Sequence, residues 1–266
     1  MRPQLKDYAY DTIVEFIRQK VEESGGNGVV VGLSGGIDSA LVSKLCVDAV
    51  GVEKVLNVFM PSHSSSRDDR KDAEQFSNEI GAEFKVMDIR PAVEAFQNML
   101  PSIDRKELLG NVMARCRMVV LMHEANLTGR IVMGTGNKSE LLVGYFTKYG
   151  DGGVDFLPIG DLYKTEVREL ARKVGISKKI IEKAPSAGLW DGQTDEGELG
   201  VSYDKLDQIL LGFEMLVDNR EISRQTGIDL NIVEMVWRRH LDTVHKRKAP
   251  LIPKVNSRTL GLDWRE

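Results

Sequence analysis

The stretch VVVGLSGGIDSALVSKLCVDAV, residues 29–50, decides the fold. It begins with a short apolar run that ends at Leu33, which is typical of a buried β-strand. Two glycines follow, and apolar residues then return at Leu41, Val42 and Leu45, a spacing typical of a helix. A buried strand that turns through glycines into a helix is a unit of α/β folds, and such a turn commonly binds phosphate. The stretch therefore predicts an anion site at the end of an early parallel strand.

The rest of the chain repeats this alternation of apolar runs and helical patterns. Further strands are expected at 55–60, 84–89, 131–134 and 156–159. Helices are expected at 13–21, 68–80, 106–126, 164–174, 178–183, 203–217 and 230–246. Strands separated by helix-length connections favour a parallel sheet. We expect an α/β fold with a doubly wound parallel sheet and flanking helices. It should form one domain over 1–266, because no repeat or linker interrupts the pattern.

Composition and charge exclude several classes of protein. The chain has 266 residues, 29% of them charged with both signs interspersed, and a net charge of −4. Neither disorder nor bulk attraction to nucleic acid is therefore expected. The amino terminus carries charges where a signal peptide needs an apolar segment, and no apolar run could span a membrane. Cys46 and Cys116 form no metal or redox motif. We expect a cytoplasmic protein without nucleic-acid or membrane partners.

The glycine turn has the sequence LSGGIDS over residues 33–39. Gly35 and Gly36 allow backbone N–H groups to approach an anion, and Ser34 and Ser39 add hydroxyl donors. The lysine of the Walker A pattern is missing, and so is the dinucleotide pattern GxGxxG. Asp38 stands in the loop instead, and it would repel a phosphate unless a cation such as Mg²⁺ lay between them. The alternative is a plain glycine-rich turn with an aspartate cap.

A phosphate loop without that lysine favours one kind of ATP chemistry. It can hold the β- and γ-phosphates without delivering a cation to the γ-phosphate. Such a loop suits pyrophosphate as a leaving group. The expected reaction is therefore attack at the α-phosphorus with transfer of AMP.

A second polar segment follows the strand expected at 131–134. It contains GTGNKSE, in which Asn137 and Ser139 can cap a helix and Glu140 falls in the first turn. Glu140 has two interpretations. It either complements the helix dipole or meets Asp38 at a shared Mg²⁺, because the ends of parallel strands converge.

Charged residues and two loops follow these motifs. Lys148, Asp155 and Lys164 surround a glycine-rich loop and a strand end. Each alone is interpreted as a solvated surface residue, and together they favour a binding site. Segments 61–71 and 187–200 are rich in polar residues and glycine. They are either lids over a ligand crevice or ordinary solvated loops.

Several motifs, in chain order, carry a resemblance to a known family: LSGGIDS, GTGNKSE, PIGDLYKTEV, KAPSAGL and HKRK. They resemble ammonia-dependent NAD⁺ synthetase, of the N-type ATP pyrophosphatase superfamily, over nearly the whole chain. The resemblance implies an adenine nucleotide alpha hydrolase-like, Rossmann-like fold. It also implies a reaction in two halves. The nicotinate carboxylate of deamido-NAD⁺ attacks the α-phosphorus of ATP, giving an NAD-adenylate and pyrophosphate. Ammonia then releases AMP and forms NAD⁺.

The resemblance also implies a role for each residue that matches a family motif. The implied ATP contacts are Gly32, Leu33, Ser34, Gly35, Gly36, Ile37, Asp38, Ser39, Thr135, Lys164 and Ser186. The implied Mg²⁺ ligands are Asp38 and Glu140, and the implied deamido-NAD⁺ contacts are Arg115, Lys148, Asp155, His245 and Lys246. Without the resemblance, Arg115 is better interpreted as a surface ion-pair residue. The HKRK run is then a set of cations at a helix end.

The expected catalytic residues are Asp38, Lys164 and Asp155. Neither half-reaction needs a protein nucleophile, because the substrate carboxylate and ammonia supply the attacking atoms. The enzyme must position its substrates and neutralise the charge that develops on the α-phosphoryl group. Mg²⁺ and Lys164 suit the second task. Asp155 is a candidate to accept a proton from ammonia or to orient it.

Partners and rival functions complete the expectations. The helix at 106–126 carries more apolar surface than a one-sided helix needs, so it forms either a homodimer interface or a wholly buried helix. No glutamine amidotransferase domain is expected, and free ammonia is the expected nitrogen donor. The rivals are a GMP synthetase-like amination, a tRNA base thiolation and a non-catalytic nucleotide-binding sensor. The acidic metal pair and the second basic site argue against the sensor.

Overall fold

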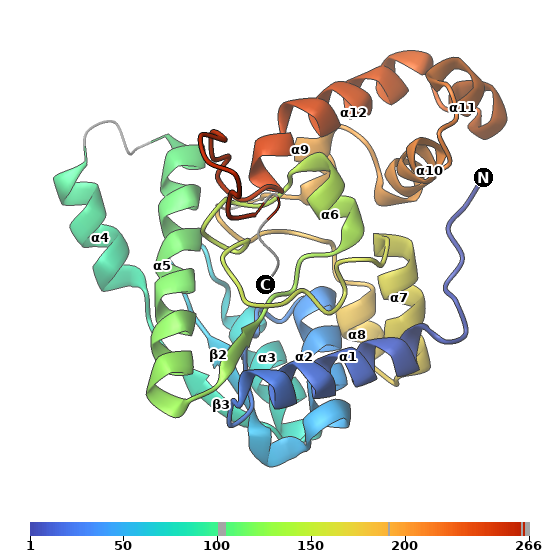
Figure 1. Ribbon diagram of the computed structural model, residues 1–266. Coiled ribbons are helices and arrows are strands. Elements are labelled where there is room, and N and C mark those ends of the chain that lie inside the picture. The colour runs from blue at the N-terminus through green and yellow to red at the C-terminus, as the bar shows by residue number, and fades with distance from the viewer. Residues whose placement is uncertain (101–104, 191, 262, 264–266) are drawn as a thin grey trace.

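The computed structural model describes residues 1–100, 105–190, 192–261 and 263 (Figure 1). Four strands form one sheet in the order β3-β2-β1-β4, with bounds β1 Val29–Gly32, β2 Val55–Phe59, β3 Glu83–Val86 and β4 Ile131–Met133. Each pairing is parallel, and Val29 of β1 lies opposite both Val55 and Ile131. The chain runs outward from β1 to β3 and then returns to place β4 on the other side of β1. This reversal is the topological switch point at which α/β sheets bind ligands.

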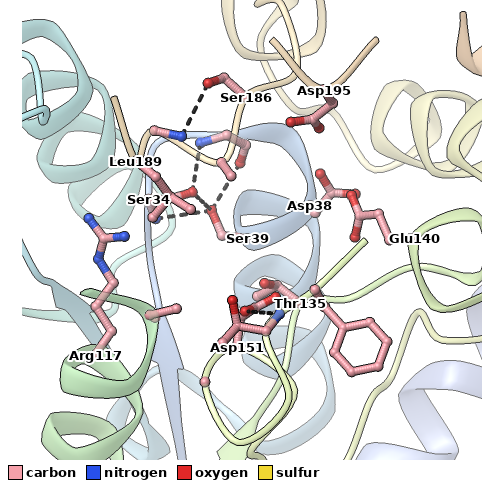
Figure 2. Close-up of a pocket in the computed structure, with 18 of the residues that line it drawn as sticks. Ser34, Asp38, Ser39, Arg117, Thr135, Glu140, Asp151, Ser186, Leu189 and Asp195 are labelled. Atoms are coloured by element: carbon pink, nitrogen blue, oxygen red, sulfur yellow. Dashed lines mark hydrogen bonds between the residues drawn. The ribbon is translucent and has the colours of Figure 1, made fainter. Parts of the chain in front are cut away.

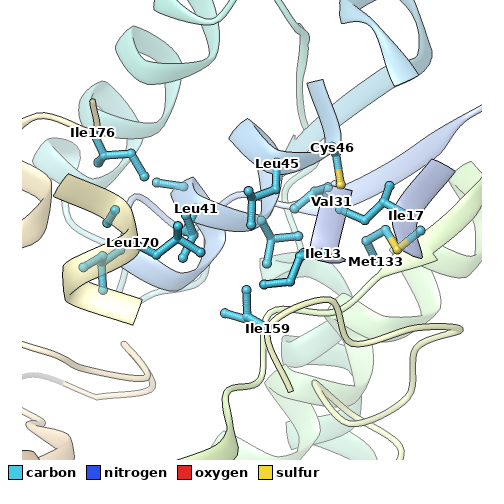
Figure 3. Packing of buried hydrophobic residues seen from close by; sticks show 14 of the residues in the cluster. Ile13, Ile17, Val31, Leu41, Leu45, Cys46, Met133, Ile159, Leu170 and Ile176 are labelled. Atoms are coloured by element: carbon cyan, nitrogen blue, oxygen red, sulfur yellow. The ribbon is translucent and has the colours of Figure 1, made fainter. Parts of the chain in front are cut away.

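Helices cover both faces of the sheet, which confirms the expected doubly wound α/β fold. One face carries α1 (Ala9–Ser24), α2 (Ile37–Val50), α3 (Arg67–Glu79), α7 (Lys164–Lys173) and α8 (Lys178–Ile181). The other face carries α4 (Arg90–Met99) and α5 (Lys106–Thr128). Side chains alternate along β1, so that Val31 packs in the first cluster and Val30 in the second. Figure 3 shows the first cluster, where Leu41 and Leu45 of α2 lie among residues from the sheet, α1 and α7.

A separate group of helices forms the upper part of the molecule in Figure 1. Its members are α6 (Lys138–Val143), α9 (Asp195–Leu199), α10 (Tyr203–Glu214), α11 (Asn219–Thr226) and α12 (Leu230–Asp242). They pack around their own apolar cluster, which includes the fully buried Tyr203. Single 3₁₀ turns, η1 (Val52–Lys54) and η2 (Val244–Lys246), complete the described elements. In the described part of the chain no helix is both long and apolar enough to cross a membrane.

The structure corrects several expected elements. The strand expected at 156–159 is reduced to one bridge between Phe156 and Met133, because Pro158 has no N–H to donate and the chain turns there. The strand expected at 84–89 ends at Val86, since α4 begins soon after it with a proline in its first turn. Helices α4 and α11 were not expected at all. The helix expected at 230–246 ends at Asp242 and continues as the 3₁₀ turn η2.

The two expected loops are partly helical. Helix α3 already begins at Arg67, inside the segment 61–71, and α9 occupies the end of the segment 187–200. Residue 191 of the second segment lies outside the described residues. A lid function of either segment stays a prediction.

Candidate active site

A cavity of about 520 Å³ lies where β1, β2 and β4 end. Residues just beyond all three strands line it, and so do parts of α5 and the segments 144–151 and 183–198. Small-molecule sites commonly have volumes of about 300–1,000 Å³. The cavity therefore has the size and the position expected of a ligand site at a switch point of the sheet.

The loop LSGGIDS forms one wall of this cavity as the chain passes from β1 into α2. Gly35 adopts a positive φ of 81°, and a side-chain carbon there would lie 2.7 Å from the carbonyl oxygen of Asp69. Ser39 Oγ accepts from the backbone N–H of Ser34 at 3.1 Å and donates to the carbonyl oxygen of Gly36 at 3.0 Å. The N–H groups in the first turn of an α-helix have no partner within the helix. Glycine, serine and helix start together make an anion cradle.

Two carboxylates and an ammonium group meet beside the cradle. The Nζ of Lys164 lies 2.5 Å from Oδ2 of Asp38 and 3.4 Å from Oε1 of Glu140. Lys164 is buried, with a side chain only 2% exposed. Figure 2 shows the carboxylates of Asp38 and Glu140 facing one another, one from α2 and one from α6. The predicted convergence of the two strand ends therefore brings these side chains together.

Local hydrogen bonds fix the helix start that carries Glu140. Asn137 is the N-cap of α6: its Oδ1 accepts from the backbone N–H of Glu140 at 3.0 Å. The carboxylate of Glu140 in turn accepts from the N–H of Asn137 at 3.2 Å. The Nδ2 group of Asn137 donates to Oδ1 of Asp38 at 2.9 Å. One capping residue thus joins the two carboxylates.

The helix start that carries Lys164 is fixed by a buried aspartate. Asp207 accepts from the backbone N–H of Thr165 at 2.8 Å and from Oγ of Ser139 at 2.5 Å. Ser139 Oγ in turn accepts from the N–H of Lys164 at 2.9 Å. These hydrogen bonds join the starts of α6 and α7 to α10. They fix the backbone from which the Lys164 side chain extends.

Burial and neighbouring charge set the protonation of this cluster. Burial raises the pKa of the Glu140 carboxyl above its ordinary value, and the charges of Asp38 and Asp195 act in the same direction. Burial alone would lower the pKa of Lys164, but the carboxylates of Asp38 and Glu140 outweigh it and raise that pKa. Lys164 therefore stays protonated at neutral pH and supplies a fixed positive charge to the cavity.

A further carboxylate, which the sequence did not single out, borders the same cluster. Asp195 is 4% exposed and lines the cavity. It accepts from the hydroxyl of Tyr203 at 3.0 Å and from the hydroxyl of Tyr145 at 3.1 Å. The Tyr203 hydroxyl also lies 3.4 Å from Oε1 of Glu140. No local pattern marks this network, because its members come from separate helices and loops.

Most residues with an implied ATP role line the cavity. They are Gly32, Leu33, Ser34, Gly36, Ile37, Asp38, Ser39, Thr135, Lys164 and Ser186, together with the implied metal ligand Glu140. Gly35 is not among the lining residues, because it faces the first turn of α3. The structure thus brings most of the implied ATP-binding residues together around one cavity.

The residues with an implied deamido-NAD⁺ role are less closely gathered. Lys246 lines the cavity, but its Nζ donates to the carbonyl oxygens of Gly144 and Phe146 at 2.7 and 2.8 Å. Arg115, Lys148 and His245 form a group outside the cavity lining. Arg115 donates to the Lys148 carbonyl at 3.3 Å, and Lys148 Nζ donates to the His245 carbonyl at 3.0 Å.

The structure places Asp155 beside the edge strand β4. It is exposed and does not line the cavity. Its Oδ2 accepts from the backbone N–H of Val132 at 2.7 Å, so it ties a loop to the edge of β4. This geometry does not support Asp155 as the proton acceptor for ammonia. Its catalytic role and its contact with deamido-NAD⁺ both stay predictions.

Comparison with known proteins decides the family. The family model described as NAD synthase matches residues 9–250. The chain belongs to the NAD synthase family. The NH(3)-dependent NAD(+) synthetase of Methanococcoides burtonii is 46% identical over 96% of this chain and 97% of its own length. The protein of the same name from Archaeoglobus fulgidus is 48% identical over 92% of this chain and 96% of its own length.

Several solved structures share the fold of this chain. The NMN synthetase of Francisella tularensis superposes with a TM-score of 0.83 at 36% identity, over 92% of this chain and 97% of that chain. The NH3-dependent NAD synthetase of Campylobacter jejuni gives a TM-score of 0.79 at 34% identity over the same shares. A glutamine-dependent NAD⁺ synthetase from Acinetobacter baumannii gives 0.69 at 32% identity, and there this chain spans 50% of that chain.

Proposed function

We propose that this chain catalyses the ATP-dependent amidation of deamido-NAD⁺ with ammonia, giving NAD⁺, AMP and pyrophosphate through an NAD-adenylate. One observation carries the proposal: the ammonium group of Lys164 lies between Asp38 and Glu140, beside an anion cradle, in a chain of the NAD synthase family. The curated relatives that carry the NH(3)-dependent name match over almost their whole length. These relatives support the proposal that ammonia is the nitrogen donor. They also support the proposal that the chain acts as one synthetase domain.

In the first half-reaction, the task of the protein is binding and charge neutralisation. The cradle formed by LSGGIDS binds the triphosphate through backbone N–H groups and the hydroxyls of Ser34 and Ser39. Lys164 places its charge beside the α-phosphoryl group as the nicotinate carboxylate attacks it. Since Lys164 is held by Asp38 and Glu140 before substrate binds, its charge is already in the cavity when the nucleotide arrives.

The side chains near Lys164 fit a bound Mg²⁺. Two carboxylates, Asp38 and Glu140, converge on one point, and carboxylate oxygen is the donor that Mg²⁺ prefers. Among the described residues no set of three His, Cys, Asp or Glu side chains is arranged to hold a metal. Mg²⁺ is commonly held by one or two carboxylates and by substrate phosphates. Asp38 and Glu140 would hold the ion, which would neutralise charge on the departing pyrophosphate.

The proposed reaction can be tested with purified protein, ATP, Mg²⁺, deamido-NAD⁺ and ammonium. We expect equal amounts of NAD⁺, AMP and pyrophosphate, and pyrophosphate release only when deamido-NAD⁺ is present. Glutamine in place of ammonium should give almost no NAD⁺, and equal support by glutamine would refute the free-ammonia donor. One similar structure is named an NMN synthetase, so the same assay is repeated with nicotinic acid mononucleotide in place of deamido-NAD⁺. A GMP synthetase-like or RNA-modifying enzyme, or a nucleotide sensor, would not form NAD⁺.

We also propose that two copies of the chain associate through α5. Val119 on α5 is 60% exposed, and Arg115 lies one turn before it on the same helix face. A second copy that covered Val119 would therefore also cover Arg115, which would complete a substrate site beyond the cavity of one chain. The expected cytoplasmic location stays a prediction.

The association is expected to depend on the apolar face of α5. Val119→Glu should convert a dimer into a monomer in sedimentation velocity, because it introduces a charge into the buried interface. Met215→Glu is a matched control, since Met215 is also 60% exposed but lies beyond the end of α10. A dimer that survives Val119→Glu, or that is lost equally in Met215→Glu, would contradict the proposed interface.

A further inference from the structure

The phosphate loop has no lysine in its own sequence, but the fold places one beside it. Lys183 belongs to the KAPSAGL segment that follows α8. Its Nζ lies 3.5 Å from the carbonyl oxygen of Gly35, and the residue lines the cavity. Ser186, from the same segment, lies on the side of the cavity that carries Ser34 (Figure 2). A cation from a distant part of the chain therefore stands at the anion cradle.

Two carboxylates of α3 hold Lys183 in this position. Its Nζ donates to Oδ1 of Asp69 at 2.6 Å and to Oδ2 of Asp72 at 3.3 Å. Burial alone would lower the pKa of Lys183, but hydrogen bonds and charges from Asp69 and Asp72 outweigh it and raise that pKa. The side chain is nevertheless 32% exposed, so a ligand in the cavity can reach it.

Both carboxylates keep other partners when Lys183 turns toward a ligand. Asp72 also pairs with Lys179. Asp69 accepts from the backbone N–H of Ser66 at 3.0 Å, within the cap of α3. Neither acid is left buried and unpaired, which is the main cost of breaking such a contact. Movement of the Lys183 amine over a short distance is therefore inexpensive.

We propose that Lys183 binds the β- and γ-phosphates of ATP, and therefore the pyrophosphate that leaves. The identity of the nucleotide rests on the proposed function. A lysine is a compact point charge and a common phosphate ligand in other nucleotide sites. Asp69 borders the same cradle, so Lys183 also screens an acid that would repel the phosphates. Lys164 neutralises charge at the reacting α-phosphorus, and Lys183 binds the pyrophosphate that leaves.

The test compares two lysines that share Asp72. Calorimetric titrations of the full chain with ATP, pyrophosphate and AMP, each with Mg²⁺, are made for Lys183→Met and Lys179→Met. Lys183→Met should weaken ATP and pyrophosphate binding about 10- to 100-fold, the effect of losing a charged hydrogen bond. It should leave AMP binding unchanged, because AMP has no β- or γ-phosphate. Lys179→Met should leave all three affinities within about twofold, since Lys179 does not line the cavity.

Other results would overturn the proposal. An equal loss in Lys179→Met would show that the lysines act only by supporting Asp72. An equal loss for ATP and AMP in Lys183→Met would place the effect outside the β- and γ-phosphates. These titrations contain no deamido-NAD⁺ or ammonia, so their outcome is independent of the proposed amidation.

A second measurement needs no variant and is not affected by misfolding. The wild-type chain is treated with an amine-acylating reagent, and modification of each lysine is followed by mass spectrometry. ATP and pyrophosphate should protect Lys183 at least about fivefold more than AMP does. Lys179, which is 66% exposed, should be modified equally under all conditions. Protection of Lys183 by AMP equal to that by ATP would contradict the assignment.

Discussion

Replacement of Lys164 by methionine is expected to lower the rate of deamido-NAD⁺-dependent pyrophosphate release about 10³-fold. The variant keeps the length and burial of the side chain but removes the positive charge between Asp38 and Glu140. In the proposed reaction, the α-phosphoryl group then loses the counter-charge of Lys164 at the moment when negative charge develops on it. The measurement is the single-turnover rate of pyrophosphate release at saturating ATP and Mg²⁺.

The same variant should also lose stability. Removal of one partner from a buried ion pair costs about 3–5 kcal/mol, because the remaining charge is left uncompensated. Asp38 and Glu140 are 18% and 16% exposed, so the lower end of that range is expected in urea unfolding. Mg²⁺ should restore part of the loss, since it can replace the missing cation between the carboxylates. It should therefore raise the unfolding midpoint more in the variant than in the wild type.

Lys138→Met is the matched control. Lys138 also pairs with two carboxylates, Asp161 at 3.0 Å and Glu214 at 2.9 Å, but it does not line the cavity. Its loss should change the rate of pyrophosphate release by less than about twofold, because it contacts no substrate. The role of Lys164 would be refuted by a Lys164→Met rate within tenfold of the wild type. An equal loss in Lys138→Met would refute it as well.

The second large effect is expected for Asp38→Asn. The substitution keeps the shape of the side chain and an oxygen that can accept from Asn137 Nδ2, but it removes the negative charge. Loss of the charge that is proposed to hold Mg²⁺ should lower the rate of adenylation about 10²- to 10³-fold. It should also raise the Mg²⁺ concentration needed for half-maximal rate. Both are measured by titrating Mg²⁺ in the pyrophosphate assay.

A control for Asp38→Asn lies on the same helix. Asp48, near the end of α2, accepts from the hydroxyl of Tyr10 at 3.1 Å and lies outside the cavity lining. Asp48→Asn should therefore leave the Mg²⁺ dependence unchanged. Near-normal adenylation by Asp38→Asn, with an unaltered Mg²⁺ requirement, would remove Asp38 from the mechanism.

The part of the site that could be predicted from sequence depends on strand ends. Asp38 and Glu140 each follow a buried strand of one parallel sheet, and the ends of such strands must meet at one edge. Their meeting was therefore open to prediction from local patterns and topology rules alone. The doubly wound fold was predictable for the same reason, because apolar runs and helix-length connections alternate along the first half of the chain.

The rest of the site depends on packing that no local pattern encodes. Lys183 reaches the loop across 148 residues, because α8 packs beside α2 and α3 on one face of the sheet. Asp195 meets Tyr203 only because α9 and the start of α10 fold back on each other. Charge patterns also do not show where an amine points: Lys246 lines the cavity, and its Nζ donates to carbonyl oxygens of its own chain.

Gly35 joins the phosphate loop to the start of α3. The first turn of α3 fills the space where a side chain of residue 35 would stand, so the loop and α3 are in direct contact and only glycine fits there. Because Asp69 of α3 also lines the cavity, we expect nucleotide to bind the folded chain in preference to chains in which α3 is detached. A ligand at 100 times its Kd stabilises the native state by about 2.7 kcal/mol. We therefore expect ATP to stabilise the folded chain. Resistance of the chain to a protease should then rise with ATP concentration.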